Sequence, residues 1–551
     1  MNKKILLTII SISISILLTS CVALGIREEN NQNKEYNFLD SEDDVIDMGP
    51  TKGGVLRLYS TIPDTLNPIL TNNIYVRDYS EFIFESLTKL DKSQKAVPVL
   101  AKSWEVSEDT LTWTFHVKED IHWHDNMPFT AEDVEFTLNA IINSPNSSYK
   151  TNVSNITTFT VVDQKTFRIV LGTPNSFTAE LMTFPILPKH YFFGEDFLTS
   201  AKNNTPIGTG PYKFSEFSPG QFVKLKSNEN WWKAEQDDKA LAKLPYIEEI
   251  EICLYEKTKI GSDAFQGGDI DVLTIDRSLW SKYNGRQDIV MKRYTTNNFE
   301  YIAFNLSNKI LKLPEVRQAI AYAVDKTKII NDILPGEAVA SDLPLMPDTW
   351  LNDTNAVFYS TDKEKARKLL EDSGWKESNG LLYKRINGAN TALKLELLVN
   401  EDNSLRVKVA EEIKNQLKEI GIELTIKKQK WEDELKSLDK NRFDMVFIGC
   451  QVTSIPDLSF MYSSETGTLN LSSYSNIEVD EYLKKIMSEK NEELKKEYYL
   501  KMKELINQDL PYLGLYFYND AVVYSKKIKG EFNPYLWNRY FDLVQWYIPI
   551  T

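Results

Sequence analysis

The stretch from 393 to 449 reads LKLELLVNEDNSLRVKVAEEIKNQLKEIGIELTIKKQKWEDELKSLDKNRFDMVFIG, and its hydrophobic residues follow two different spacings. Apolar residues alternate from Leu393 to Val399 and again from Ile422 to Ile426, which predicts two strands. Between them, spacings of three and four residues from Leu405 to Ile420 predict a helix, which ends before a glycine. A strand, a helix and a strand in this order are the unit of a parallel sheet.

The same order continues to the end of the stretch. A helix expected over Trp431–Leu438 precedes the apolar run FDMVFIG, so strands and helices alternate over about sixty residues, as in a parallel, doubly wound α/β sheet. Such sheets bind ligands in the crevice outside the carboxyl ends of their strands. The segment Cys450–Asp457 leaves that end of the third strand, so we expect it to form a wall of a binding site. By the same rule, the loop 61–73 after an expected strand at Val55–Ser60 faces such a crevice.

Composition limits the classes of protein that this chain can belong to. With 551 residues, of which 42% are hydrophobic, it can form two or three packed domains. Its 79 acidic and 64 basic residues give a net charge of -15, which argues against a nucleic-acid partner because phosphate binding needs concentrated positive charge.

The N-terminus has the layout of an export signal. Lys3 and Lys4 precede an apolar run over Ile5–Leu18 that is too short to span a membrane comfortably. The run ends in LTSC, which resembles the bacterial lipobox, so we expect residues 1–20 to be a signal peptide and Cys21 to carry a lipid anchor. The alternative is an ordinary signal with a chance cysteine. An anchored Cys21 would place the rest of the chain outside the cytoplasm.

Residues 21–49 are acidic and rich in asparagine, without hydrophobic periodicity, which predicts a solvated tether between the anchor and the folded body. After Cys21 only Cys253 and Cys450 remain. A disulfide between them is possible outside the cell, but we expect two buried free thiols.

Six motifs recur in a fixed order along the body and together resemble the family 5 solute-binding lipoproteins of ABC importers, which include oligopeptide- and dipeptide-binding proteins. The resemblance runs from about Gly53 to the C-terminus. The motifs are ESLTKLD, VLAKSWEVSEDTLTWTFHVKEDIHWHDNMPFTAEDVEFT, PIGTGPYKF, NENWW, FNLSNKILKLPEVRQAIAYAVDK and LNLSSYSNIEVDEYL.

The resemblance implies a two-lobed, type II periplasmic-binding-protein fold (a Venus flytrap) with an extra domain inserted in lobe I. It also implies a monomer that closes around a ligand and docks on an ABC permease and its ATPase. The expected divisions are 50–83, 206–300 and 511–551 for lobe I, 84–205 for the inserted domain, and 301–510 for lobe II.

Most residues of these motifs are expected to hold structure rather than ligand. Gly208 and Gly210 in PIGTGPY only superficially resemble a phosphate-binding loop, since no lysine follows at the required spacing. A helix over Ile74–Leu87 and one capped by Thr130 are expected in the first half of the chain. The other residues expected to be architectural are Pro211, Trp231, Trp232, Arg317 and Asp325.

Metal binding and catalysis are weaker interpretations of the sequence. His122 and His124 would share one face of a strand, but a zinc site needs three or four ligands, and neither His116 nor His190 completes a metal motif. The chain has no G-x-S-x-G elbow and no spacing that singles out a carboxylate pair. We therefore predict no metal, no cofactor and no enzymatic activity, with an extracellular hydrolase as the less favoured alternative.

The wall segment departs from the pattern of peptide-binding family members, which place an aspartate there to pair with the ligand's α-amine. Thr453 occupies that position, or Ser454 if the alignment slips by one residue, and Cys450 replaces a tryptophan. A buried ammonium needs a fixed counter-charge. The anchor is therefore absent, displaced to Asp457, or unnecessary for this ligand; Asp457 equally suits a capping role.

Peptide main chain could still pair with Gly449–Ser454 like an added strand, while Tyr75 and Trp431 could line pockets or simply pack in the core. We expect a peptide-like ligand; the alternatives are a modified peptide, a nickel or haem chelate, a sugar, or a role as a ligand sensor. The candidate ligand-binding residues are Tyr75, Trp431, Gly449, Cys450, Gln451, Val452, Thr453, Ser454 and Asp457.

Overall fold

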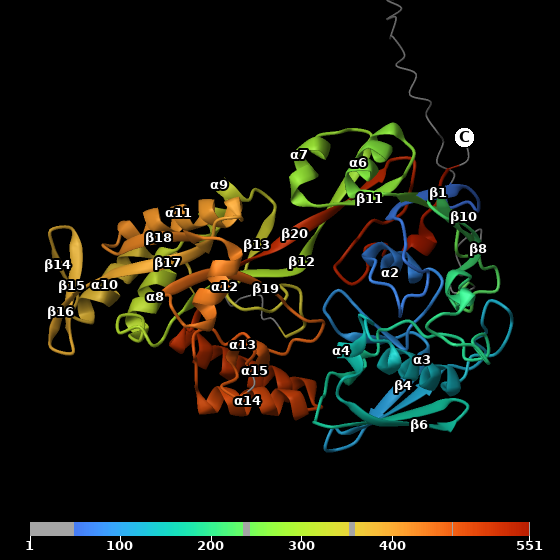
Figure 1. Cartoon of the computed structure of the whole chain (residues 1–551), viewed down its shortest axis with the longest axis horizontal. Coiled ribbons are helices and arrows are strands. Elements are labelled where there is room, and N and C mark those ends of the chain that lie inside the picture. The colour runs from blue at the N-terminus through green and yellow to red at the C-terminus, as the bar shows by residue number, and fades with distance from the viewer. Residues whose placement is uncertain (1–48, 235–242, 352–358, 466, 550–551) are drawn as a thin grey trace, which may run out of the picture. The chain divides into compact units, whose positions relative to one another are not determined.

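The computed structural model describes residues 49–234, 243–351, 359–465 and 467–549 (Figure 1). The predicted signal peptide, Cys21 and nearly all of the predicted tether lie outside these residues. Within the described ranges, no helix has both the length and the apolar character that crossing a membrane requires.

The stretch 393–449 folds as its hydrophobic pattern predicts. Its elements are β17 (Lys394–Asn400), α11 (Ser404–Lys418), β18 (Glu423–Gln429), α12 (Trp431–Asp439) and β19 (Met445–Gln451). Strand β17 runs parallel to both β18 and β19. Leu397 packs into one buried cluster with Ile413, and its neighbour Leu398 packs into another with Tyr499. Both faces of the sheet are covered, which is why the strand is apolar at consecutive positions.

These strands belong to a larger mixed sheet of 11 strands, ordered β18-β17-β19-β12-β20-β11-β1-β10-β9-β8, with β13 paired to β20 off this path. Strand β12 is antiparallel to both β19 and β20, so the parallel order ends at β19. Figure 1 shows β12 and β20 passing from the strands around β17 to those around β1 and β10. Two groups of strands therefore share these two long strands. The other members are β1 (Val55–Thr61), β8 (Tyr212–Ser218), β9 (Phe222–Ser227), β10 (Glu249–Tyr255), β11 (Val272–Ile275), β12 (Ile289–Phe304), β13 (Ala338–Ala340) and β20 (Tyr512–Ser525).

The segment 84–205 contains an antiparallel sheet of 4 strands, in the order β4-β5-β7-β6. Helix α3 has the predicted capping box, in which the Thr130 backbone N–H donates to Asp133 Oδ2 at 2.9 Å. The limits of the inserted domain and of the two lobes stay a prediction. The elements of this segment are β2 (Thr88–Leu90), β3 (Ala96–Pro98), β4 (Ala101–Val106), β5 (Thr112–Val117), α3 (Ala131–Asn143), α4 (Lys150–Val153), β6 (Ile156–Asp163), β7 (Thr166–Leu171), α5 (Thr178–Leu181) and η1 (Ala201–Asn204).

Helix α2 (Ile74–Ser80) is shorter than the helix predicted over Ile74–Leu87. The chain after α2 is hydrogen-bonded to the PIGTGPY segment: the Gly210 N–H donates to the Ile83 carbonyl at 2.9 Å. A Cβ added to Gly208 would lie only 1.7 Å from the same carbonyl oxygen. The glycines of this motif therefore permit a close backbone crossing, which is the architectural role expected for them.

His124 belongs to the same crossing. Its Nδ1 accepts the Gly208 N–H at 3.2 Å and its Nε2–H donates to the Gly210 carbonyl at 3.0 Å. Burial lowers the pKa of His124 to about 4, so the ring is neutral. His122 and His124 do not share a strand face as predicted, because both lie in irregular chain outside the named strands. The described residues contain no group of three or more side chains arranged to hold a metal ion.

Arg317 on α8 also has the architectural role that was expected. Its guanidinium donates to the carbonyls of Leu311, Asp509 and Leu510, and so ties the helix to the start of β20. Further elements are α6 (Thr258–Gly267), η2 (Arg277–Leu279), α7 (Trp280–Tyr283), α8 (Pro314–Ala323), α9 (Lys326–Ile333), α10 (Lys363–Asp372), β14 (Lys376–Ser378), β15 (Leu381–Ile386), β16 (Ala389–Ala392), α13 (Ser459–Tyr462), α14 (Ile477–Ser488), α15 (Glu492–Asp509) and η3 (Leu543–Gln545).

Candidate functional site

Strand β19 extends to Gln451, so the predicted wall begins as strand rather than loop. On one side β19 pairs with β12 as far as Gln451, which lies opposite Asn298. On its other side, pairing with β17 stops at Phe447. In the described part of the chain no strand continues that second edge, so the main chain over Ile448–Gln451 has one side without a strand partner. An extended ligand that adds to a sheet needs an edge of this kind.

A buried ion pair lies against this part of β19. Arg406 on α11 donates from Nε and Nη2 to the two carboxylate oxygens of Glu300 on β12, at 2.7 and 2.8 Å. The two side chains are only 12% and 5% exposed. A Cβ at Gly449 would lie 2.6 Å from Glu300 Oε1 and 2.7 Å from Arg406 Nη2. Glycine at this candidate site residue therefore leaves room for the ion pair.

A second carboxyl group, on Glu434 of α12, lies near the same pair. The side chain is fully buried, and neither oxygen accepts a hydrogen bond from the described residues. Burial raises the pKa of Glu434 to about 7; the positive charge of Arg406 opposes this shift and the negative charge of Glu300 adds to it. Glu434 consequently changes its protonation near neutral pH.

Polar groups of the wall after β19 form hydrogen bonds with other groups of the protein. The Val452 N–H donates to the Asn297 carbonyl at 2.9 Å, and the Val452 carbonyl accepts from the Asn297 side chain at 2.9 Å. The Thr453 hydroxyl donates to the Ile455 carbonyl at 2.8 Å. The Ser454 carbonyl accepts from Gln94 Nε2 at 3.4 Å. These contacts fix the course of the wall next to β12.

Asp457 makes a local hydrogen bond just before α13. Its Oδ1 accepts the Ser459 N–H at 2.8 Å, and the side chain is half-buried. The N-cap of α13 is Leu458, so Asp457 lies one residue before the capping position, and its role as a displaced amine anchor stays a prediction. Thr453 and Ser454 carry hydroxyl groups at the two positions where the resemblance implied a carboxylate, and the Thr453 hydroxyl already donates to the Ile455 carbonyl.

Both cysteines of the body are free thiols, as expected, but each is half-buried rather than fully buried. Burial raises the pKa of the Cys450 thiol to about 12, and the nearby charge of Glu300 adds to the shift. Burial likewise raises the pKa of Cys253 to about 12. Both thiols therefore stay protonated at neutral pH and are poor nucleophiles.

The two aromatic candidates have different surroundings. Tyr75 packs edge-on against Tyr59, with 5.1 Å between the ring centres, beside a buried cluster that includes Phe265. Trp431 is 40% exposed at the start of α12, and its backbone N–H donates to Asp402 Oδ2 at 3.4 Å. Tyr75 thus takes part in core packing, the alternative weighed for it, whereas Trp431 presents its ring to solvent.

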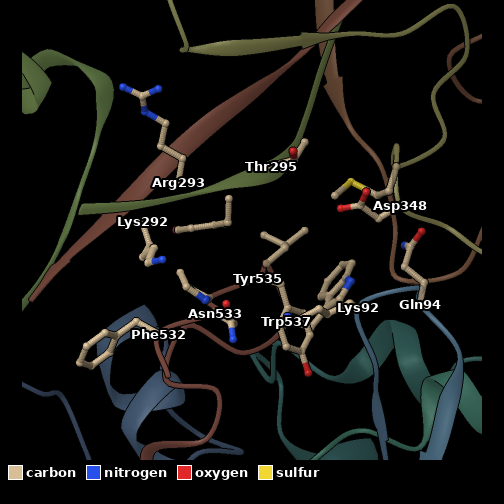
Figure 2. A pocket seen from close by; sticks show the side chains of 14 residues that line it. Lys92, Gln94, Lys292, Arg293, Thr295, Asp348, Phe532, Asn533, Tyr535 and Trp537 are labelled. Atoms are coloured by element: carbon tan, nitrogen blue, oxygen red, sulfur yellow. The ribbon is translucent and has the colours of Figure 1, made fainter. Parts of the chain in front are cut away.

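A cavity of about 300 Å³ lies beside β12 (Figure 2). Its lining comes from Lys92 and Gln94 in the β2–β3 turn, from residues 292–295 of β12, and from residues 532–537 near the C-terminus, with a smaller share from the chain before residue 350. Gln94 connects the cavity to the wall, since it also donates to the Ser454 carbonyl.

This cavity could not be predicted from the sequence. Its main lining segments are about two hundred or more residues apart along the chain, so no local pattern contains them. The aromatic residues of NPYLWN, Tyr535 and Trp537, were the one local signal, because large aromatic side chains close together in a polar loop often mark a binding surface. Lys92 and Lys292 belong to no motif.

Comparison with known proteins identifies the family. The family model named bacterial extracellular solute-binding proteins, family 5 (middle region), matches residues 95–470. The chain belongs to this family. Family 5 proteins bind solutes and are not enzymes, and the resemblance seen in the six sequence motifs is confirmed.

Individual relatives cover most of the chain. The oligopeptide-binding protein AppA of Bacillus subtilis is 24% identical over 497 residues, which are 87% of this chain and 89% of AppA. Heme-binding protein A of Haemophilus influenzae is 24% identical over 482 residues, or 82% and 84% of the two chains. The structure of NikZ from Campylobacter jejuni in complex with Ni(L-His) is 27% identical, covers 90% of this chain and 99% of NikZ, and has a TM-score of 0.61.

The family match confirms the predicted α/β fold of the two-lobed, type II kind. The names of the relatives differ in what they carry: an oligopeptide, haem, or a nickel–histidine complex. Membership of family 5 therefore establishes solute binding, and the residues of this chain must indicate which solute.

Proposed function

We propose that this family 5 protein captures peptides between its lobes outside the cytoplasm and delivers them to an ABC import permease and its ATPase. The observation that carries the proposal is the unpaired edge of β19 over Ile448–Gln451. An extended peptide can hydrogen-bond to such an edge through its main chain, whatever its side chains are, and water can fill the remaining space. The oligopeptide-binding name of AppA supports the same class of cargo.

The proposed location is the outer face of the cytoplasmic membrane, where a monomer would be held by a lipid on Cys21. The LTSC sequence supports this proposal, and Cys21 itself lies outside the described residues. We expect radiolabelled palmitate to be incorporated into the wild-type protein in cells and to be absent from Cys21→Ala. Equal labelling of both proteins would contradict the anchor.

Other cargoes remain as alternatives within the same fold: a modified peptide, a nickel or haem chelate, or a sugar. The haem-binding and Ni(L-His)-bound relatives favour the chelates as the second candidate. Against them, the described residues contain no group of three metal-ligating side chains, although a chelate brings most of its own ligands. A ligand sensor would need the same capture of cargo and differs only in its membrane partner.

The cargo itself is the direct test. We expect mass spectrometry of the small molecules released by denaturing the purified protein to find peptides, because tightly bound cargo is retained through purification. The matched control is the same preparation in which the protein has first been unfolded, washed and refolded, which should release none. Recovery of only sugars, haem or nickel complexes would overturn the peptide assignment while leaving the family unchanged.

A further inference from the structure

Phe177 lies in the segment 84–205 but packs into a different hydrophobic cluster from the rest of that segment. Other buried side chains of the segment, such as Phe167 and Leu187, belong to one cluster with residues of β1, β9 and β10. The fully buried Phe177 ring belongs instead to a cluster with Tyr499 and Met502 of α15. The other described residues of that second cluster all lie between positions 299 and 536. Phe177 therefore joins the segment 84–205 to a distant part of the chain by packing alone.

Hydrogen bonds next to Phe177 hold it at the end of α14. The Ser176 N–H donates to the Met487 carbonyl at 2.7 Å, and the Ser176 hydroxyl donates to the Ile486 carbonyl at 3.0 Å. Within the segment itself, the Asn175 side chain accepts the Phe177 N–H at 2.8 Å. The turn that presents the ring is therefore fixed on its own side and hydrogen-bonded to α14 on the other.

The turn between β2 and β3 makes a second contact with the same part of the chain. The Trp350 N–H donates to the Ser93 carbonyl at 3.0 Å. Lys95 forms an ion pair with Glu492 of α15, and its ammonium lies 4.7 Å from the centre of the Trp350 ring. The side chains of Lys95 and Glu492 are 35% and 54% exposed, so this ion pair adds little stability.

These contacts remove two polar groups from water. The Lys495 ammonium lies 4.2 Å from the centre of the Phe177 ring and 5.7 Å from that of Trp350, and Lys495 is only 4% exposed. Burial lowers the pKa of Lys495, and the charge of Glu180 opposes the shift. The Trp350 indole N–H is buried without a hydrogen-bond partner among the described residues. Both groups would regain water if the contacts opened, so their desolvation offsets part of what burial of Phe177 contributes.

We propose that Ser176, Phe177 and the β2–β3 turn form a latch, which opens from α14, α15 and Trp350 to release cargo and closes to retain it. The assignment rests on the proposed function, because it takes the cargo to be held between two lobes. Strands β12 and β20 join the two groups of strands covalently, whereas the latch is one buried ring with a few hydrogen bonds that water can replace. The latch is therefore the contact that gives way when the lobes separate, and Phe177 sets how fast cargo escapes.

Hydrogen–deuterium exchange measures opening of the latch whatever the cargo is. The Ser176 and Trp350 amides donate across the latch, so they exchange when it opens. In the full-length wild type we expect both amides to exchange much faster than the paired amides of β20. Phe177→Ala should speed both by about 100-fold or more, the usual effect of deleting a buried phenylalanine ring, and Phe177→Leu should speed them less.

The second measurement is the amount of small molecules that the purified protein releases on denaturation. Phe177→Ala should retain at least about 10-fold less than the wild type, because a weaker latch raises the dissociation rate. The matched control for Phe177→Leu is Phe167→Leu, since Phe167 is equally buried but packs in the other cluster and should change neither measurement. Thermal melting verifies that all three variants fold.

Two results would overturn the latch. One is exchange of the Ser176 and Trp350 amides in the wild type that is as slow as in β20, which would make the contact permanent. The other is a Phe177 variant that opens the contact and still retains its cargo like the wild type. If the wild type holds only sugars or chelates and Phe177→Ala loses them, the latch stands and peptide capture is rejected instead.

Discussion

Arg406→Met is expected to lower the free energy of unfolding by about 3–5 kcal/mol, the usual cost of removing one partner from a buried ion pair. The Glu300 side chain is 5% exposed and loses both of its hydrogen bonds from Arg406. The fully buried Glu434 loses its nearest positive charge at the same time. Urea denaturation at pH 7, followed by tryptophan fluorescence, measures the change.

The control for this prediction also removes the Glu300 carboxylate, which Arg406→Met leaves buried without a counter-charge. Glu300→Gln added to Arg406→Met replaces the buried carboxylate by a neutral amide, so the double variant should regain most of the lost stability. An equal loss in the single and double variants would mean that the methionine disturbs packing and that the charge of Glu300 is not what makes the single variant unstable.

Glu434→Gln is expected to stabilise the protein by about 3 kcal/mol at pH 8, because burial raises the pKa of Glu434 from 4.5 to about 7 and a tenfold change in proton affinity corresponds to about 1.4 kcal/mol. The pKa of Glu434 is raised in the folded protein, so the folded state holds this proton more tightly than the unfolded state. The wild type consequently loses stability as pH rises from about 4.5 to about 7, and the variant lacks this loss. Urea denaturation of both proteins at pH 4, 6 and 8 measures the difference.

Glu432→Gln provides the matched control, because Glu432 lies in the first turn of the same helix and is exposed. It should unfold like the wild type at every pH. A stability difference between Glu434→Gln and the wild type that stays constant from pH 4 to pH 8 would show that folding does not raise the pKa of Glu434.

The parts of the fold that could be predicted from the sequence are those determined by local periodicity. Strand β18 and helix α11 bury side chains at the spacing of a strand and a helix, and β17 and β19 are short apolar runs buried on both faces, so local sequence reveals these elements. Family motifs supplied the rest of the architecture, because they recur in the same order in proteins that share the fold. The binding-site wall after β19 was inferred from the general placement of ligands at the ends of parallel strands and stays a prediction.

Long-range contacts explain what could not be predicted. The ion pair under Gly449 joins residues of α11 and β12 that are 106 positions apart, so no local pattern contains it. The helix expected to run to Leu87 ends at Ser80, and the chain after it hydrogen-bonds to the PIGTGPY segment, far along the chain, through the carbonyls of Phe82 and Ile83. The roles of Thr453, Ser454 and Asp457 in holding cargo depend on the ligand and stay predictions.

The sharing of β12 and β20 by both groups of strands has a consequence for cooperativity. Neither group can unfold alone without stripping hydrogen-bonded partners from a strand that the other group needs. Multidomain proteins often unfold in separate steps, but two groups of strands that share β12 and β20 should unfold as one cooperative unit. A substitution at Arg406 would then lower the stability of β1 and β10 as well, and both groups of strands would unfold in one transition at one temperature.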